Sequence, residues 1–481
     1  MPKRQKRRRE IDVRSTLIAA IDSAPAREPD ERLSGGQGAT PDAWRAIAMA
    51  TLATGVVIGY RAGGGGGVAR MLVASGTAAT VASAVALALA SRRPDPFSPA
   101  LASPDPGDAT RTTFSVVIAA RDEVDVLPRL VRDLGAQDHR TPDGRPLFEL
   151  VLIDDRSTDG TAQAALRAAA AGGLSEITRS IRRGGDDLPD GKGAALTAAQ
   201  PDTCHGDVVV VLDADARVGP GFLSGLARYF DAGADAITPR RRVLDADSSW
   251  LAGAQADEQT ADAEIQRGRW LLGGLSEFRG NGIAVRRSLL ADAGGWRAEA
   301  LTEDLDLSSR IAGETGSAVA HALDVEVWEE PVATWDGLWR QRVRWAEGAL
   351  RRALEHGPAV LGSPWVTPRA KLDFAAYIGQ LALPPVILGA VVRAWRTGRG
   401  RGARAILGAY ALVAAGLTYD ALRWETDSGG APLLRTVRLR RALRAAAFGC
   451  MWLAAVPAAM WRLAMREGPV AYDKMEHGPR S

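Results

Sequence analysis

Cysteine and histidine are scarce in this 481-residue chain, and their scarcity excludes several kinds of site. Only Cys204 and Cys450 are present, so the sequence holds no disulfide framework and no cysteine-based metal centre. The five histidines show no His-Glu-x-x-His or similar spacing, which argues against a transition-metal hydrolase.

Two phosphate-binding fingerprints are also missing. The chain has no Gly-x-x-x-x-Gly-Lys-Ser/Thr loop, which excludes a P-loop enzyme. No Gly-x-Gly-x-x-Gly follows the first expected strand, Phe114–Ala120, which argues against a dinucleotide-dependent oxidoreductase.

Positive charge is unevenly distributed, although the net charge is only +3. Residues Lys3–Arg9 are almost all basic, and five arginines between residues 435 and 444 form a second cluster. Few aromatic residues accompany these clusters, so they suit anionic lipid headgroups better than nucleic acid. We therefore expect a membrane partner and no nucleic acid; a nucleic-acid-binding N-terminus is the alternative.

Long apolar stretches lie at both ends of the chain. Near the N-terminus, Trp44–Tyr60 and Met71–Ala90 are separated by the glycine run 63–67. The second stretch is long enough to span a bilayer, and the first spans it if its aromatic ends lie in the interface. A pair of buried, alanine-rich soluble helices is the alternative. A cleaved signal peptide fits poorly, because both stretches lie far from the N-terminus.

Three further apolar stretches, Phe374–Val392, Ala405–Tyr419 and Ala445–Trp461, lie in the C-terminal third. Pro384 and Pro385 predict a kink or a re-entrant turn in the first of them. Both connecting loops are rich in arginine, and the positive-inside rule cannot place both on the cytoplasmic side if all three stretches span. At least one stretch is therefore expected to be interfacial or re-entrant.

Between these regions, strand patterns alternate with helix patterns. Phe114–Ala120, Phe148–Ile153 and Val208–Leu212 read as buried strands, and Val124–Leu134 and Thr161–Ala171 read as helices. This alternation predicts an α/β domain with a parallel, doubly wound sheet.

Carboxylates follow each of the three strands. They are Asp122 with Glu123, Asp154 with Asp155, and Asp213 with Asp215. Ligands of open α/β sheets bind at the carboxyl ends of the strands. Side chains at alternate positions of an extended chain point the same way, so the last pair can hold a hard divalent cation. That pair alone would suit a solvated turn, but three acidic strand ends together favour a shared site.

Six segments of this region resemble, in order, the motifs of family-2 glycosyltransferases. They are Ala119–Glu123, Ile153–Thr161, Gly191–Leu196, Asp213–Asp215, Thr302–Asp304 and Gln341–Trp345. The last two are similar to acceptor-side motifs of the membrane-bound branch, which includes cellulose, chitin and hyaluronan synthases and ceramide glucosyltransferase. The resemblance covers roughly residues 113–350. It departs from the usual Pro-x-x-Asn-Glu by having Ala119 and Asp122.

The resemblance implies a GT-A-type, doubly wound mixed sheet flanked by N- and C-terminal transmembrane or interfacial helices. It implies metal-dependent, inverting transfer of a sugar from a nucleotide diphosphate sugar, such as a UDP-sugar, to a lipid or a growing glycan, with Mg²⁺ or Mn²⁺ as cofactor. The implied location is a bacterial cell membrane, with the catalytic domain in the cytoplasm. A processive polysaccharide synthase with its own channel and a catalytically silent membrane scaffold are the alternatives.

The resemblance also assigns residue roles. Asp304 is expected to be the catalytic base. The residues expected to bind the nucleotide sugar are Asp122, Asp154, Asp155, Lys192 and Asp213. The residues expected to hold the metal are Asp213 and Asp215. The residues expected to contact the acceptor or the diphosphate are Glu303, Gln341, Arg344 and Trp345. Two further segments, Phe278–Gly282 and Gly294–Trp296, resemble the acceptor site, where Trp296 would offer a flat apolar face.

Structural roles compete with some of these assignments. Asp155 can cap the helix that begins near Thr161, and Thr302 can cap a helix that begins beside Asp304. The pattern around Trp335–Trp345 also predicts an amphipathic helix lying on the membrane.

These inferences divide the chain into six parts. They are a disordered basic N-terminus (1–40), two transmembrane helices (41–92), a linker (93–112), the GT-A domain with an interfacial helix at its end (113–350), C-terminal transmembrane or interfacial helices (351–465) and a tail (466–481).

Overall fold

The computed structural model describes residues 41–64, 67–98, 112–185, 189–427 and 429–465. The N-terminal region 1–40, most of the linker (99–111) and the tail 466–481 lie outside the described residues, and so do the predictions made for them.

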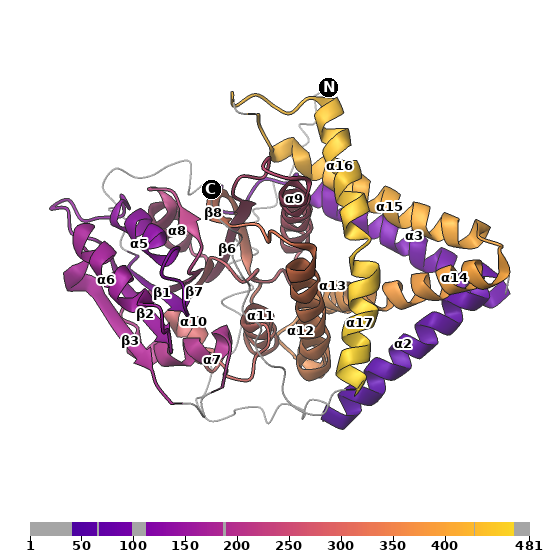
Figure 1. Cartoon of the computed structure of the whole chain (residues 1–481), viewed down its shortest axis with the longest axis horizontal. Helices are drawn as coiled ribbons and strands as arrows, with labels where there is room; N and C mark the ends of the chain where they lie inside the picture. The colour runs from indigo at the N-terminus through magenta and orange to yellow at the C-terminus, as the bar shows by residue number, and fades with distance from the viewer. Residues whose placement is uncertain (1–40, 65–66, 99–111, 186–188, 428, 466–481) are drawn as a thin grey trace, which may run out of the picture. The chain divides into compact units, whose positions relative to one another are not determined.

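Residues 114–329 contain an eight-stranded mixed sheet (Figure 1). In chain order its strands are β1 Phe114–Ala120, β2 Phe148–Asp155, β3 Thr178–Arg183, β4 Val208–Asp213, β5 Arg217–Val218, β6 Ala236–Val243, β7 Ile283–Arg286 and β8 Ala320–Glu329. Their order across the sheet is β3-β2-β1-β4-β7-β6-β8-β5. Strands β3, β2, β1 and β4 are parallel, whereas β7 is antiparallel to β4 and β6.

The mixed sheet agrees with the fold implied by the resemblance, and the wholly parallel sheet predicted from alternation alone is wrong. The cause is the route of the chain into β7. The segment 272–282 arrives at the carboxyl end of β4, where the Gly282 N–H donates to the Val211 carbonyl over 3.0 Å. Since no crossover returns the chain to the opposite edge, β7 can only run antiparallel.

Helices cover both faces of the sheet, as the continuous apolar runs of the central strands require. On β4, Val208, Val210 and Leu212 pack into one core, and Val209 and Val211 into the other. The helices of the first core are α5 Leu127–Gly135, α6 Thr161–Ala171 and α8 Phe222–Asp231. The helices of the second core are α7 Lys192–Leu196, α10 Arg287–Asp292 and α11 Glu303–Thr315.

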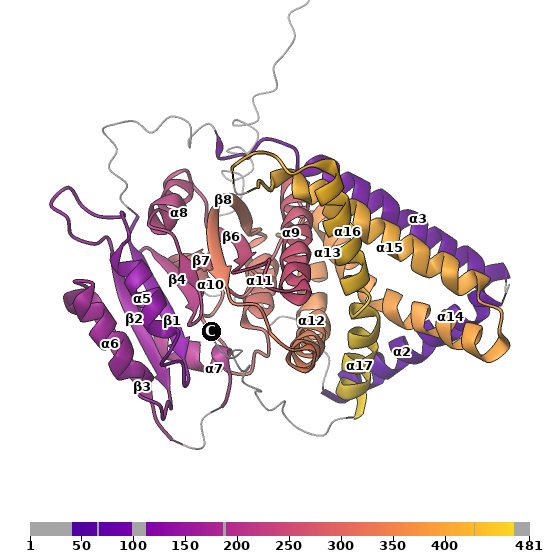
Figure 2. The ribbon, with the colours of Figure 1, turned by 45° about the horizontal axis from the view of Figure 1, so that its top comes forward.

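Two long helices, α9 (Trp250–Leu271) and α12 (Trp335–Gly362), lie between the sheet and the apolar helices (Figure 2). Helix α12 begins at the expected interfacial segment but continues past the boundary predicted at residue 350. Trp335 and Trp339 are exposed on it, while Leu338 and Val343 are buried.

Five helical segments of the described residues are long and apolar enough to cross a membrane: 42–63, 67–90, 368–397, 401–424 and 435–465. The helices concerned are α2 Pro41–Gly63, α3 Gly67–Ala90, α13 Pro368–Gly379, α14 Leu383–Thr397, α15 Arg401–Ala421, α16 Arg435–Gly449 and α17 Trp452–Met465. The break before Pro384 and Pro385 separates α13 from α14 and matches the expected kink.

Helices α2 and α14 approach each other at backbone distance. Gly55, Gly59 and Gly63 are spaced by four residues along α2, the spacing that brings small residues onto one helix face. A Cβ atom at Gly59 would lie 1.8 Å from the Val386 carbonyl oxygen, and one at Gly389 would lie 2.0 Å from the Val56 carbonyl oxygen. Glycine at these positions is therefore required for the pairing of the two helices.

This packing predicts that Gly59→Val destabilises the protein by about 1–3 kcal/mol, because the added side chain forces the two backbones apart. The melting temperature of the full chain in detergent checks the prediction. Gly408→Val on α15 is the matched control, since a Cβ at Gly408 meets nothing within 4 Å. Equal losses in the two variants would contradict the role assigned to the α2–α14 contact.

Candidate active site

The acidic ends of β1, β2 and β4 lie side by side, because these strands are neighbours in the sheet. In the parallel register, Ala119 pairs with Asp213 and Ala120 with Asp154. The structure thus brings the three acidic strand ends to one edge, as the sequence predicted.

Asp122 connects the loop after β1 to the loop after β2 by hydrogen bonds. Its Oδ1 accepts a hydrogen bond from the Thr158 N–H over 2.8 Å, and its own N–H donates to Ser157 Oγ over 3.0 Å. Its φ of 53° lies in the left-handed region, which an aspartate tolerates better than most residues. Asp122 therefore shapes the edge of the site.

Asp154 and Asp155 are buried and have different partners. Asp154 Oδ1 accepts from the Ser157 N–H over 3.0 Å. Asp155 Oδ1 lies 2.7 Å from Arg183 Nη1 and 3.0 Å from Arg156 Nε. The alternative capping role of Asp155 is wrong, because Gly160 is the N-cap of α6 and the Thr161 N–H at the start of that helix donates to Asp159 Oδ1 over 2.9 Å.

Lys192, at the start of α7, joins three parts of the site. Its Nζ donates to Asp213 Oδ1 over 2.6 Å and to the Gly280 carbonyl over 2.9 Å, and it lies 3.1 Å from Glu303 Oε1. Burial opposes the charged ammonium, but Asp213 and Glu303 outweigh it and raise the pKa of Lys192. A permanent positive charge therefore lies between two carboxylates.

Asp213 and Asp215 both line the cavity at the end of β4. Burial alone would raise the pKa of Asp213, but Lys192, Arg241 and Arg344 hold it below its ordinary value. Asp213 is therefore ionised, with Oδ1 taken by Lys192. The other metal-ligating atoms that Asp213 and Asp215 offer are also carboxylate oxygens. Mg²⁺ and Mn²⁺ prefer ligands of this type, so the pair fits a hard divalent cation.

Asp304 lies on the first turn of α11, across the cavity from β4. Burial and then the charge of Glu303 raise the pKa of Asp304 to about 6. The positive charges of Arg279 and Lys192 oppose that rise. Thr302 is the N-cap residue of α11, as expected, although its side chain makes no capping hydrogen bond with the helix.

The Gln341–Trp345 segment lies on α12 and faces the same cavity. The Gln341 Oε1 accepts a hydrogen bond from Arg342, and the Arg342 guanidinium lies 4.2 Å from the ring centroid of Trp345. Arg344 lines the cavity, and its charge helps to keep Asp213 ionised. Three residues expected from sequence, Gln341, Arg344 and Trp345, are thus brought together with the carboxylates.

Trp296 does not reach the site. It is only 3% exposed and packs in the core beneath the sheet, so the flat face expected there is not available to an acceptor. The other expected acceptor segment, Phe278–Gly282, does lie at the site, because the Gly280 carbonyl bonds to Lys192.

The sequence did not reveal several polar residues that line the cavity. They are Arg241, Glu258, Asp262 and Tyr377, whereas Arg279 falls within the expected acceptor segment. The one available signal was three successive arginines, 240–242, within an apolar-flanked strand pattern. Glu258 and Asp262 lie on α9 and Tyr377 lies on α13, helices whose burial depends on contacts between distant parts of the chain.

Within the described ranges, Asp306, Glu355 and His356 form a group with metal-ligand spacing. Asp306 is already bonded to Arg310 Nη2 over 2.8 Å, to Arg297 Nη1 over 3.2 Å and to His356 Nε2 over 2.8 Å. Two guanidinium groups supply the positive charge that a metal would bring. We therefore interpret this group as an ion-pair network.

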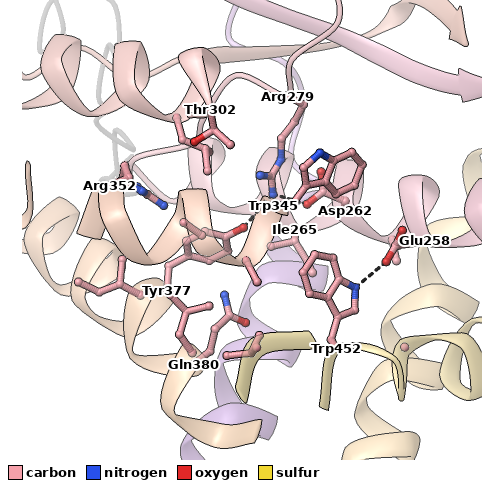
Figure 3. A pocket seen from close by; sticks show the side chains of 18 of the residues that line it. Glu258, Asp262, Ile265, Arg279, Thr302, Trp345, Arg352, Tyr377, Gln380 and Trp452 are labelled. Atoms are coloured by element: carbon pink, nitrogen blue, oxygen red, sulfur yellow. Dashed lines mark hydrogen bonds and ion pairs between the residues drawn. The ribbon is translucent and has the colours of Figure 1, made fainter. Parts of the chain in front are cut away.

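One cavity of about 1320 Å³ joins the carboxylates to the apolar helices. At one end it is lined by Asp155, Lys192, Asp213, Asp215, Glu303 and Asp304. At the other end it is lined by apolar residues such as Leu72, Val73, Ile406, Val413, Val386 and Ile387, which lie on α3, α15 and α14. Figure 3 shows its middle part, where Trp345, Trp452, Tyr377 and Arg279 surround the space.

Known proteins resemble this chain over the same region. The family described as "Glycosyltransferase like family 2" matches residues 111–348. The beta-monoglucosyldiacylglycerol synthase of Trichormus variabilis is 33% identical over 285 residues, which are 58% of this chain and 58% of that protein. The protein of the same description from Synechocystis sp. is 30% identical over 387 residues, 77% of each chain.

Among solved structures, the mannosyltransferase PcManGT from Pyrobaculum calidifontis, in complex with GDP-Man and Mn²⁺, is 20% identical. The likeness covers 86% of this chain and 99% of that one, with a TM-score of 0.48. The match to the Trichormus relative spans little more than half of its length, whereas the match to the Synechocystis relative spans over three quarters.

The family match covers the whole mixed sheet together with the segments that line the polar end of the cavity. The extended match to the Synechocystis relative continues beyond that domain. The chain belongs to glycosyltransferase family 2, in its membrane-associated branch.

Proposed function

We propose that this enzyme transfers a single hexose from a nucleotide diphosphate sugar, with UDP as the nucleotide, to the free hydroxyl of a diacylglycerol-type lipid. The single observation that carries the proposal is the shared cavity, polar at the sheet edge and apolar between α3, α14 and α15. Its volume of about 1320 Å³ exceeds the range of roughly 300–1,000 Å³ typical of small-molecule sites. It therefore suits a nucleotide sugar together with part of a lipid.

The relatives named above support this choice of acceptor. Their description specifies a β-linked glucose on diacylglycerol. An acceptor of this kind brings two acyl chains, and the apolar end of the cavity offers a lining of matching character. A processive synthase would instead extend a polar glycan through that end.

The reaction we propose is a single displacement with inversion. The acceptor oxygen forms a bond to the anomeric carbon while the bond from that carbon to the diphosphate oxygen breaks, and the diphosphate keeps the electron pair. Asp304 accepts the proton of the acceptor hydroxyl as the anomeric carbon becomes oxocarbenium-like. Its pKa of about 6 leaves it mostly ionised near neutral pH yet basic enough to act.

The remaining residues of the site hold the donor. Asp213 and Asp215 would hold the divalent cation, which, when bound, neutralises charge that develops on the leaving diphosphate. Lys192 and Arg344 place positive charge at the same end of the cavity. We assign Asp122, Asp154 and Asp155 to the nucleoside, with Asp122 and Asp155 acting through the loops that they fasten.

We further propose that the chain is a multi-pass protein of the bacterial cell membrane, with its catalytic domain on the cytoplasmic side, where nucleotide sugars are made. Five helical segments of the described chain have the length and composition to span a bilayer. The exposed Trp335 and Trp339 of α12 suit the interface between lipid and water.

Membranes that contain the enzyme are predicted to transfer label from radioactive UDP-glucose to added diacylglycerol, giving a product that extracts into organic solvent. Asp304→Asn should lower this activity at least about 100-fold, because the acceptor proton loses its base. Chromatography of the lipid extract gives the measurement. Glu299→Gln, which changes an exposed carboxylate whose side chain is 78% exposed, should keep the wild-type rate.

Label that remains in material of high molecular weight would favour a processive synthase. Unchanged activity in Asp304→Asn would contradict the assignment of the base.

The pH dependence offers a second prediction. The base acts when ionised, so kcat/KM should rise with pH and level off above a midpoint near 6. Glu303→Gln removes the neighbouring negative charge that raises the pKa of Asp304. The midpoint should therefore move to lower pH in this variant.

Lys192→Met should move the midpoint the other way, since the Lys192 ammonium stabilises the ionised form of Asp304. Profiles of kcat/KM between pH 4.5 and 9, roughly the range in which a carboxyl group of raised pKa titrates, provide the measurement. Shifts of the same sign in both variants would be inconsistent with electrostatic control of Asp304.

A further inference from the structure

Between the catalytic carboxylates and the apolar end, the cavity is lined by charged side chains. These side chains form ion pairs with one another. Arg279 contacts Asp262 of α9, and its Nη2 donates to the Tyr377 hydroxyl of α13 over 2.8 Å (Figure 3). Gln266 Nε2 also reaches that hydroxyl, over 3.3 Å. We call Asp262, Arg279 and Tyr377 the headgroup cluster.

The headgroup cluster lies beside the base. Asp262, Arg279, Tyr377 and Asp304 all line the same cavity. Arg279 precedes Gly280, where an added Cβ would lie 3.7 Å from Asp304 Oδ2. A lipid that presents its hydroxyl to Asp304 while its chains extend toward α3 and α15 must place its polar head at this cluster.

Behind the cluster, further charges continue the same pairing. Arg352 Nη1 lies 2.7 Å from Glu277 Oε1, and Arg269 Nη2 lies 3.0 Å from Asp373 Oδ2. Arg279 Nη1 also lies 3.8 Å from Glu277 Oε2. Three arginines (269, 279 and 352) thus face three carboxylates (262, 277 and 373), so this network of described residues carries no net charge.

A network without net charge is expected to bind anionic and uncharged lipid headgroups with different affinities. A phosphate entering here would meet arginines that already have carboxylate partners, and it would lie near Asp262 and the ionised Asp304. Like charges placed together repel, and a carboxylate that the phosphate displaces loses its partner. A diacylglycerol instead brings no charge to this cluster: its single free hydroxyl faces Asp304, and its ester oxygens can accept a hydrogen bond from the Tyr377 hydroxyl without changing the balance of charge.

From this geometry we infer that the headgroup cluster selects an uncharged, hydroxyl-bearing lipid and rejects lipids with an anionic headgroup. The inference rests on the proposed function, since it concerns the same acceptor, but it assigns the selection to residues outside the catalytic group. Asp262 is the residue that determines the charge specificity, because its carboxylate neutralises Arg279, which adjoins the glycine beside the base.

The test is a binding measurement on the purified full chain in micelles of a neutral detergent, with fluorescent phosphatidic acid as the probe and diacylglycerol as the competitor. Asp262→Asn leaves the subsite one charge more positive, so it should bind phosphatidic acid at least about fivefold more tightly than the wild type. Tyr377→Phe changes no charge and should leave that affinity unaltered, while it raises the KM for diacylglycerol.

Asp336→Asn is the matched control. It also removes the carboxylate partner of an arginine, Arg340 at 2.9 Å, but on the exposed start of α12 and outside the cavity. It should bind phosphatidic acid as the wild type does. The inference is overturned if the wild type binds phosphatidic acid as tightly as diacylglycerol, or if Asp262→Asn gains no more than Asp336→Asn.

These outcomes are separable from the proposed function. Failure of the wild type to transfer sugar to diacylglycerol would overturn the proposed acceptor, whereas the binding of phosphatidic acid is read without any transfer.

Discussion

The contact of Lys192 with Asp213, Glu303 and the Gly280 carbonyl is the interaction on which the site depends. It connects the end of the central strand, the start of α11 and the loop that leads into β7. These three segments are distant in sequence, and each carries one part of the proposed chemistry. A single ammonium therefore sets the spacing between the diphosphate end of the cavity and the base.

The same contact governs the charges of the site. Two carboxylates at this edge would repel each other and any incoming diphosphate, but Lys192 offsets that repulsion and keeps Asp213 ionised. Burial raises the pKa of Asp304, and the negative charge of the adjacent Glu303 adds to that rise. Neighbouring carboxylates thus acquire different proton affinities, which is the arrangement that general-base chemistry uses.

The sequence predicted the strands and the acidic edge well, because both follow from local patterns. Buried runs such as Val208–Leu212 fix strands, and parallel neighbours must present Asp154 and Asp213 at one edge. The sequence failed where the outcome depends on distant contacts. Trp296 lies in the core because it packs with the apolar side chains on the second face of the sheet. Arg279 and Asp262 become neighbours only when α9 packs beside the loop before β7.

One cavity extends from these charges into the apolar helices. The proposed reaction requires that the nucleotide sugar and the lipid meet within it. A structure of the full chain with a non-transferable UDP-glucose analogue and diacylglycerol tests that claim most directly. The account predicts the diphosphate beside Asp213 and Lys192, the free hydroxyl of the lipid at Asp304, and its acyl chains between α3 and α15. A lipid bound outside this cavity, or with its hydroxyl directed away from Asp304, would contradict it.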